Sequence, residues 1–169
     1  MGIAASGRTP YVLGGMQFAR SRGAKVVALT SNPSAEMRAW ADVSIIPVVG
    51  PEVIAGSSRM KSGTAQKLVL NMLSTATMVR LGRVLSGYMV HVQLTNQKLW
   101  KRAQGIIMKL TGTSEAVAGR VLRESGRNLP AALLMILKKV PKSEAARLLR
   151  EDPNAAKVLR KALRNRMIR

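Results

Sequence analysis

The sequence predicts an α/β fold in two parts. Residues 1–110 form a partial domain with a parallel sheet and helices on both faces, and residues 111–169 form a small all-helical module. In the first part, short apolar segments alternate with helix-like segments, an order that requires right-handed crossovers and a parallel sheet. After residue 111, short helix-like segments with capping residues follow one another. Hydrophobic residues make up 47% of the chain and aromatic residues only 3%, so aliphatic side chains and methionine must build the core.

The first half is predicted to alternate strands and helices. Thr9 is placed to cap the first helix, and Pro10 fits its first turn, where a missing N–H costs nothing. The predicted elements are a strand that ends with GIAAS, a helix over 10–22, a strand over 24–30, a short helix from Ser34 and a strand over 43–49. Three strands make a thin sheet, so we expect further strands to precede the first one.

Two longer helices are predicted next. Residues 65–85 are apolar almost all round, which is typical of a helix buried against a sheet or across a subunit interface. Residues 87–110 have a more amphipathic pattern. Four short helices then follow, over 114–125, 129–139, 143–150 and 154–166, with Ser114, Asn128 and Ser143 as their predicted caps.

The chain is strongly basic, with a formal net charge of +20. Residues 111–169 hold fourteen cations and five acids, so much of the excess lies in the helical module. Such a charge attracts nucleic acid, anionic membrane or a phosphorylated ligand without choosing among them. The basic stretch KVLRKALRNRMIR, residues 157–169, is a possible contact for RNA or anionic lipid, but a solvated amphipathic helix is the favoured interpretation.

The residue types present exclude several kinds of catalytic and metal site. The chain has no cysteine and one histidine, His91, which excludes thiolate or histidine-cluster metal sites and a histidine-based triad within one chain. No apolar run is long enough to span a membrane, and no signal peptide is recognisable, so a cytoplasmic location is expected.

The first candidate site is AASGRTP, residues 4–10, between the end of a strand and the start of a helix. The hydroxyls of Ser6 and Thr9, the backbone of Gly7 and the first amides of the helix could hold a phosphate, with Arg8 adding charge. An ordinary capped turn explains the same residues, and the spacing alone leaves both interpretations open.

The second candidate site is GPEVIAGSSRMKSGTAQK, residues 50–67. Ligands gather at the carboxyl ends of parallel strands, so this loop and the first could face one pocket. Its predicted hydrogen-bond donors are Ser57, Ser58 and Thr64, with Lys61 or Arg59 to neutralise the anion and Glu52 beside them. Glu52 is the only acid in either candidate site, whereas acid–base catalysis commonly uses a pair. The alternative is a solvated connection.

Two stretches of the sequence resemble the second half of the N-acetylmuramic acid 6-phosphate etherases: GIAASGRTPYVLGG and GPEVIAGSSRMKSGTAQKLVLNMLSTATM. That family belongs to the sugar isomerase (SIS) superfamily, whose domains have a flavodoxin-like parallel sheet. The resemblance runs from residue 2 to about 105, and the helical end is similar to the family's C-terminal module. The resemblance implies a cytoplasmic lyase of peptidoglycan recycling. Such an enzyme cleaves the lactyl ether of N-acetylmuramic acid 6-phosphate to give N-acetylglucosamine 6-phosphate and D-lactate, and it needs no metal or organic cofactor. The resemblance assigns Ser6 and Thr9 to phosphate binding, residues 57–64 to the sugar-phosphate pocket and Glu52 to its border.

The resemblance also predicts what is missing. The pair of glutamates proposed as the family's acid and base lies upstream of GIAASGRTP, and nothing in this sequence matches those positions. The family commonly forms homodimers, which suits the apolar helix 65–85. Three hypotheses remain: a truncated or split etherase that needs an N-terminal SIS half, a non-catalytic sugar-phosphate-binding regulatory module, and a basic fragment bound to RNA or a large assembly.

Overall fold

The computed structural model describes residues 1–167 and the side chains of residues 1–164. It divides into two compact units, one over Met1–Ser74 and the other from Thr75 onward. This division falls earlier in the chain than residue 111, and the domain boundary proposed there stays a prediction.

The first unit contains a parallel three-stranded sheet of order β1-β2-β3, which confirms the predicted sheet and fold class. In the register, Gly2 lies beside Ala28, and Ala28 lies beside Ser44. The elements are β1 (Gly2–Ile3), α1 (Pro10–Ser21), β2 (Val27–Leu29), the 3₁₀ helix η1 (Glu36–Trp40), β3 (Val43–Ile45) and the beginning of α2 (Lys61–Arg80).

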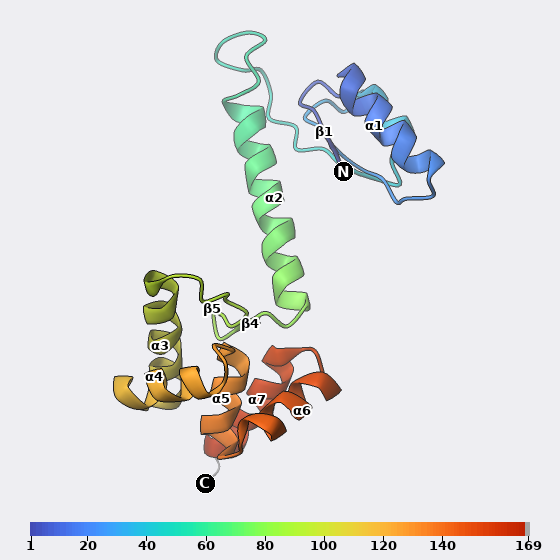
Figure 1. Cartoon of the computed structure of the whole chain (residues 1–169). Helices are drawn as coiled ribbons and strands as arrows, with labels where there is room; N and C mark the ends of the chain where they lie inside the picture. The colour runs from blue at the N-terminus through green and yellow to red at the C-terminus, as the bar shows by residue number, and fades with distance from the viewer. Residues whose placement is uncertain (168–169) are drawn as a thin grey trace. The chain divides into compact units, whose positions relative to one another are not determined.

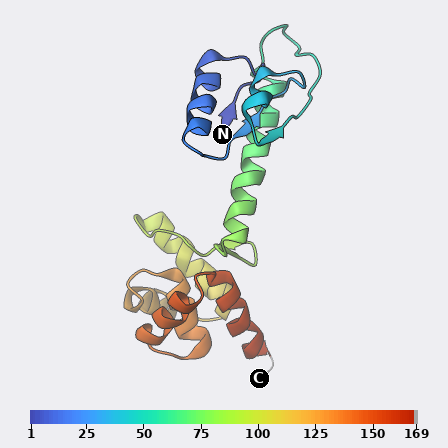
Figure 2. The same ribbon diagram turned by 90° about the vertical axis from the view of Figure 1, so that its right-hand side faces the viewer.

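Helix α1 and η1 pack together and contact the sheet (Figures 1 and 2). The core between them consists of small aliphatic side chains and methionine, as the composition predicts: Met16, Val26, Ala28, Ala35 and Met37 are buried. Gly2 lies directly over α1, since a Cβ added to it would be 2.3 Å from the sulfur of Met16. The strand can therefore approach the helix this closely only without a side chain at that position.

The third strand is shorter than predicted, because it ends at Ile45 rather than at residue 49. The carbonyl of Ile45 still accepts a hydrogen bond from the amide of Thr30 at 3.1 Å. Pro47 follows two residues later and has no N–H to continue the ladder. Residues 46–60 are therefore a loop that connects the sheet to α2.

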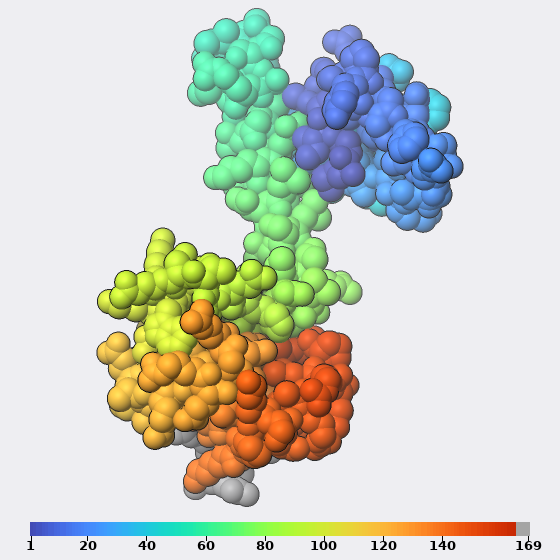
Figure 3. Space-filling model, in the orientation of Figure 1, coloured from blue at the N-terminus to red at the C-terminus, as the bar shows by residue number. Residues whose placement is uncertain are grey.

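Helix α2 is not buried against the sheet, so that half of the prediction for residues 65–85 is wrong, whereas its burial across a subunit interface stays a prediction. It starts earlier, at Lys61, and ends at Arg80, and Ser62 is its only buried residue. Leu68 is 52% exposed and Met72 is 62% exposed, and α2 forms part of the green surface in Figure 3. The all-round apolar pattern correctly indicates a helix, but a pattern does not show which molecule covers it.

The second unit is a helical bundle preceded by a small hairpin. Its elements are β4 (Val84–Leu85), β5 (Tyr88–Met89), α3 (Gln97–Thr111), α4 (Glu115–Glu124), α5 (Leu129–Lys138), α6 (Lys142–Glu151) and α7 (Ala155–Met167). Helix α5 is central, since it contacts α3, α4, α6 and α7. Its residues 129–134 are all buried, and they join the largest hydrophobic core of the chain.

The helix predicted over residues 87–110 starts only at Gln97, and the antiparallel hairpin of β4 and β5 precedes it. The hairpin turn is Ser86–Gly87, where both residues have positive φ, at 48° and 79°. Apolar residues on either side of a Ser-Gly pair are a hairpin signal that the helical interpretation overlooked. His91 consequently lies in an exposed loop rather than on a helix.

Two of the three predicted caps in the helical module are confirmed. The side chains of Ser114 and Asn128 accept hydrogen bonds from the amides of Val117 and Ala131, at 3.4 and 3.0 Å. Ser143 was the wrong choice, because α6 begins at Lys142 and its N-cap is Pro141, without a side-chain cap.

Candidate functional site

The loop that follows β1 is a tight turn built around Gly7. The amide of Gly7 donates to the carbonyl of Ala4 at 3.1 Å, and that of Arg8 donates to the hydroxyl of Ser6 at 3.4 Å. Gly7 is buried and has a φ of +68°, which favours glycine. Ser6, Arg8 and Thr9 are exposed. The turn thus presents two hydroxyls and one guanidinium to solvent at the carboxyl end of β1.

Thr9 occupies the predicted N-cap position of α1, with Pro10 as the first helical residue. Its side chain makes no capping hydrogen bond. A hydroxyl at a helix start that does not cap its own helix is available to a ligand.

A third segment, residues 30–32 at the end of β2, holds the Gly7 turn in place, although it is not among the predicted site residues. After β2, Thr30 donates its hydroxyl to the carbonyl of Ala5 at 3.0 Å, and the side-chain amide of Asn32 donates to the carbonyl of Ser6 at 3.1 Å. The hydroxyl of Ser31 between them is buried without a hydrogen-bond partner. The run TSNPS, residues 30–34 at the end of the predicted strand 24–30, could have indicated these residues, because parallel strands end at one edge of the sheet.

Glu52 binds the start of α2. Its carboxylate oxygens accept hydrogen bonds from the backbone amides of Lys61 and Ser62, at 2.9 and 3.0 Å. These bonds, chiefly the one from the Ser62 amide, hold the pKa of the Glu52 carboxyl below its usual range. Glu52 therefore fills the anion-accepting position at this helix start with a carboxylate from the chain itself.

The remaining predicted residues of the second loop lie around this cap. The ammonium of Lys61 donates to the carbonyl of Pro51 at 2.8 Å, and the carbonyl of Ser58 accepts from the amide of Gly63 at 2.9 Å. Ser57 is half-buried, whereas Ser58 and Thr64 are exposed. The loop is thus closed at its base by Glu52 and Lys61, with hydroxyls on its surface.

The two predicted loops belong to the same unit, but no hydrogen bond or ion pair joins residues 4–9 to residues 50–64 among the described residues. The structure brings the Gly7 turn together with residues 30–32 instead. Whether the second loop completes the same pocket stays a prediction.

Other kinds of site find little support in the part of the chain that the structure describes. There, no three His, Cys, Asp or Glu side chains are grouped so as to hold a metal ion. The described helices include none with the length and hydropathy that a bilayer crossing requires.

Comparison with known proteins confirms the resemblance. The chain is 48% identical over 165 residues to an N-acetylmuramic acid 6-phosphate etherase of Klebsiella aerogenes, a match that covers 98% of the chain and 54% of that protein. It is 53% identical over 149 residues to N-acetylmuramic acid 6-phosphate etherase 1 of Vibrio cholerae, covering 88% of the chain and 50% of that protein. No protein-family model matches the sequence. The chain spans about half the length of the curated relatives it matches, and the match falls in their C-terminal half.

Proposed function

We propose that this chain, a homologue of the C-terminal half of the N-acetylmuramic acid 6-phosphate etherases, supplies one side of a sugar 6-phosphate pocket. In this proposal the pocket serves the cytoplasmic lyase reaction that cleaves the D-lactyl ether and yields N-acetylglucosamine 6-phosphate and D-lactate. The substrate phosphate binds at the Gly7 turn, and residues 57–64 border the sugar.

The observation that carries the proposal is the fixed Gly7 turn with its exposed hydroxyls. Hydrogen bonds from Thr30 and Asn32 hold the backbone of residues 5 and 6, so the Ser6 hydroxyl is positioned before any ligand arrives. The N-terminal turn of α1, free of a side-chain cap, follows directly. Preorganised hydroxyls beside a helix N-terminus and an arginine suit a phosphate dianion.

We further propose that this chain does not carry out the acid–base steps alone. Glu52 is the only carboxylate in the candidate loops, and two backbone amides already bind it. Its lowered pKa makes it a weak base at neutral pH. Its proposed role is to close the 53–60 loop, and the acid and base must come from another polypeptide segment.

The test is calorimetric titration of the chain with N-acetylglucosamine 6-phosphate, together with a D-lactate release assay on the etherase substrate. We expect binding without lactate release. Ser6→Ala and Lys61→Ala should each weaken binding by about tenfold, the cost of losing a hydrogen bond to a charged group. Ser34→Ala, which removes an exposed hydroxyl from the next loop, is the matched control. Unchanged affinity in both site variants would reject this pocket assignment.

The same titration distinguishes the regulatory alternative. A chain that binds the sugar phosphate tightly, and that stays inactive when an N-terminal etherase half is added, is a binding module rather than part of an enzyme. Recovery of lactate release after that addition supports the lyase.

A second candidate, binding of nucleic acid, rests on the charge of the second unit. Among the described side chains of this unit, three cations take part in ion pairs with acidic residues: Arg120, Arg147 and Lys157. Helix α7 presents four exposed cations, Lys157, Arg160, Lys161 and Arg164. The predicted contacts Arg166 and Arg169 lie outside the described side chains.

This candidate predicts a specific salt dependence. Affinity for a labelled single-stranded RNA should fall linearly with the logarithm of salt concentration, and Arg160→Glu with Lys161→Glu should flatten the slope. Equal slopes for the double variant and for the wild-type chain would exclude α7 as the contact.

A further inference from the structure

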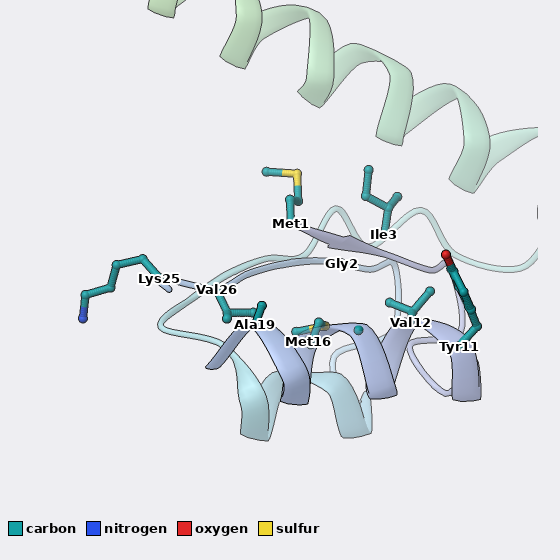
Figure 4. Close-up of a pocket in the computed structure, with 10 residues that line it drawn as sticks. Met1, Gly2, Ile3, Tyr11, Val12, Met16, Ala19, Lys25 and Val26 are labelled. Carbon is teal, nitrogen blue, oxygen red and sulfur yellow. The ribbon is translucent and has the colours of Figure 1, made fainter. Parts of the chain in front are cut away.

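The cleft between β1 and α1 in the first unit does not suit an anionic ligand. Its volume is about 420 Å³, and the one charged side chain in its lining is that of Lys25. Figure 4 shows this side chain extending away from Val12 and Met16 on α1, and its ammonium pairs with Asp42 at 3.0 Å. A partner attracted by the positive charge of the chain therefore needs a different surface, and the second unit provides one.

Helix α3 carries a row of cations on its exposed face. The helix lies at one side of the bundle (Figure 1), and its residues Ala103, Ile106 and Ile107 are buried in the core. With about 3.6 residues per turn, positions 98, 101, 102, 105 and 109 share the side of the helix opposite these three. All of these positions except Gly105 hold exposed cations: Lys98, Lys101, Arg102 and Lys109.

No acidic residue of the chain neutralises this row. The sequence has no Asp or Glu over residues 53–114. Among the described side chains, Lys98, Lys101 and Arg102 take part in no ion pair. Like charges three or four positions apart on one helix destabilise it, so the row costs stability. Its presence is explained if an anionic partner binds this face.

Gly105 lies in the middle of the row and gives a second indication. Glycine weakens a helix, and a Cβ added to Gly105 would meet no atom of the chain within 4 Å. Packing inside the chain therefore does not explain the residue. The ammonium of Lys109, one turn further on, lies 5.8 Å from the centre of the Tyr88 ring, a cation–π contact that steadies the side chain and keeps its charge. A bare backbone between cations lets an extended anion approach the helix closely.

The composition of this face distinguishes between anionic partners. A helix that lies on an anionic membrane needs large apolar side chains beside its cations, but those of α3 lie in the core or pack against it. An acidic protein would require aromatic or apolar anchors at the centre of the interface, where this face has Gly105. A phosphodiester backbone requires charge and close approach, and both are present.

We propose that the exposed face of α3, formed by Lys98, Lys101, Arg102, Gly105 and Lys109, binds the phosphate backbone of a nucleic acid without reading its sequence. The proposal concerns a different helix from α7. It does not rest on the sugar-phosphate assignment, which concerns the first unit.

The first test is fluorescence anisotropy of a labelled single-stranded RNA of mixed sequence, titrated with the full chain over a range of salt concentrations. Lys101→Gln with Arg102→Gln should weaken binding about tenfold and should reduce the slope of log affinity against log salt by about 1.4, because each phosphate contact contributes about 0.7. The matched control, Lys138→Gln with Arg150→Gln, removes the same charge from exposed positions on α5 and α6 and should keep the wild-type slope.

Three outcomes of this titration would overturn the proposal. Equal slopes for the two double variants would mean that net charge alone attracts the RNA. A slope reduced only by Arg160→Glu with Lys161→Glu would place the contact on α7. Binding of the chain to phosphatidylglycerol vesicles but not to RNA would assign the face to a membrane.

A second variant tests the close approach without changing the charge. Gly105→Leu should lower RNA affinity about fivefold by holding the phosphates away from the cations. Leucine favours a helix more than glycine does, so circular dichroism should show no loss of helix. Unchanged RNA affinity would overturn the close approach at Gly105. All α3 variants should bind N-acetylglucosamine 6-phosphate like the wild-type chain, so failure of this proposal is distinct from failure of the sugar-phosphate pocket.

Discussion

Glu52 and Ser62 are joined by a hydrogen bond of 3.0 Å between the Glu52 carboxylate and the Ser62 backbone amide. The amide of Lys61 binds the second carboxylate oxygen at 2.9 Å. Residues 53–60 are thereby closed into a loop that ends where α2 begins.

This contact predicts a pH dependence of stability. Because the hydrogen bonds lower the pKa of Glu52 in the folded state, its stabilisation is fully present above the ordinary value of 4.5 and is lost as the pH falls through the lower folded value. Thermal unfolding of the wild-type chain and of Glu52→Gln should therefore differ most near pH 7 and converge in acid. A difference that is constant from pH 7 to pH 3 would show that ionised Glu52 does not stabilise the loop.

Gly7→Ala should destabilise the first unit. Its φ of +68° disfavours a side chain by roughly 1–2 kcal/mol, and the added Cβ would lie 2.2 Å from the Cβ of Ala35. Gly50→Ala separates the two effects, because Gly50 has a φ of +70° and open space around it. Urea unfolding should give a larger loss of free energy for Gly7→Ala than for Gly50→Ala. Equal losses would mean that the turn can move away from Ala35.

Asn32→Ala should weaken sugar-phosphate binding although Asn32 is not proposed to touch the ligand. It removes the hydrogen bond from the Asn32 side-chain amide to the carbonyl of Ser6, and the Ser6 hydroxyl then loses its fixed position. We expect an affinity loss of about threefold to tenfold by calorimetry. Asn71→Ala, on the exposed surface of α2, serves as the control and should bind like the wild-type chain.

Leu133→Ala should destabilise the helical unit strongly. Leu133 is fully buried in the core formed around α5, and removal of such a side chain typically costs about 2–5 kcal/mol. Leu81, which is 53% exposed, provides the comparison, and Leu81→Ala should change the unfolding free energy by less than about 0.5 kcal/mol. Urea unfolding monitored by circular dichroism measures both, and a loss below 1 kcal/mol for Leu133→Ala would contradict the assigned core.

Local chemistry explains which elements could be predicted from the sequence. The starts of three helices could be predicted within a residue or two from Pro10, Ser114 and Asn128. These residues act on the nearest backbone groups, so their effect can be recognised without the tertiary structure. The prediction of a helix over 87–110 is wrong at its start, because the amphipathic pattern belongs to α3 alone and the two-residue turn at Ser86–Gly87 lies before it.

The candidate site was predictable only in part. The hydroxyl-rich turn at Ser6 is visible as a sequence motif, but the support from Thr30 and Asn32 depends on two parallel strands ending side by side. The contact of Glu52 with Ser62 was also not predicted, because the chain between them must fold back before the carboxylate reaches the amides. A motif indicates the residue types of a site, and the hydrogen bonds that orient them come from tertiary structure.

The close approach of Gly7 to Ala35 constrains how relatives of this protein can vary. A side chain at position 7 would meet the Cβ of Ala35 at 2.2 Å, the hydroxyl of Thr30 at 3.0 Å and the sulfur of Met37 at 3.2 Å, so a change at position 7 is coupled to the residues around it. Ala35→Gly should recover part of the stability lost in Gly7→Ala, and the remainder should exceed the backbone strain measured at Gly50, because Thr30 and Met37 still crowd the added Cβ. A substitution at position 7 alone is therefore expected to be selected against, whereas pairing it with a smaller residue at position 35 provides a route by which the turn can change.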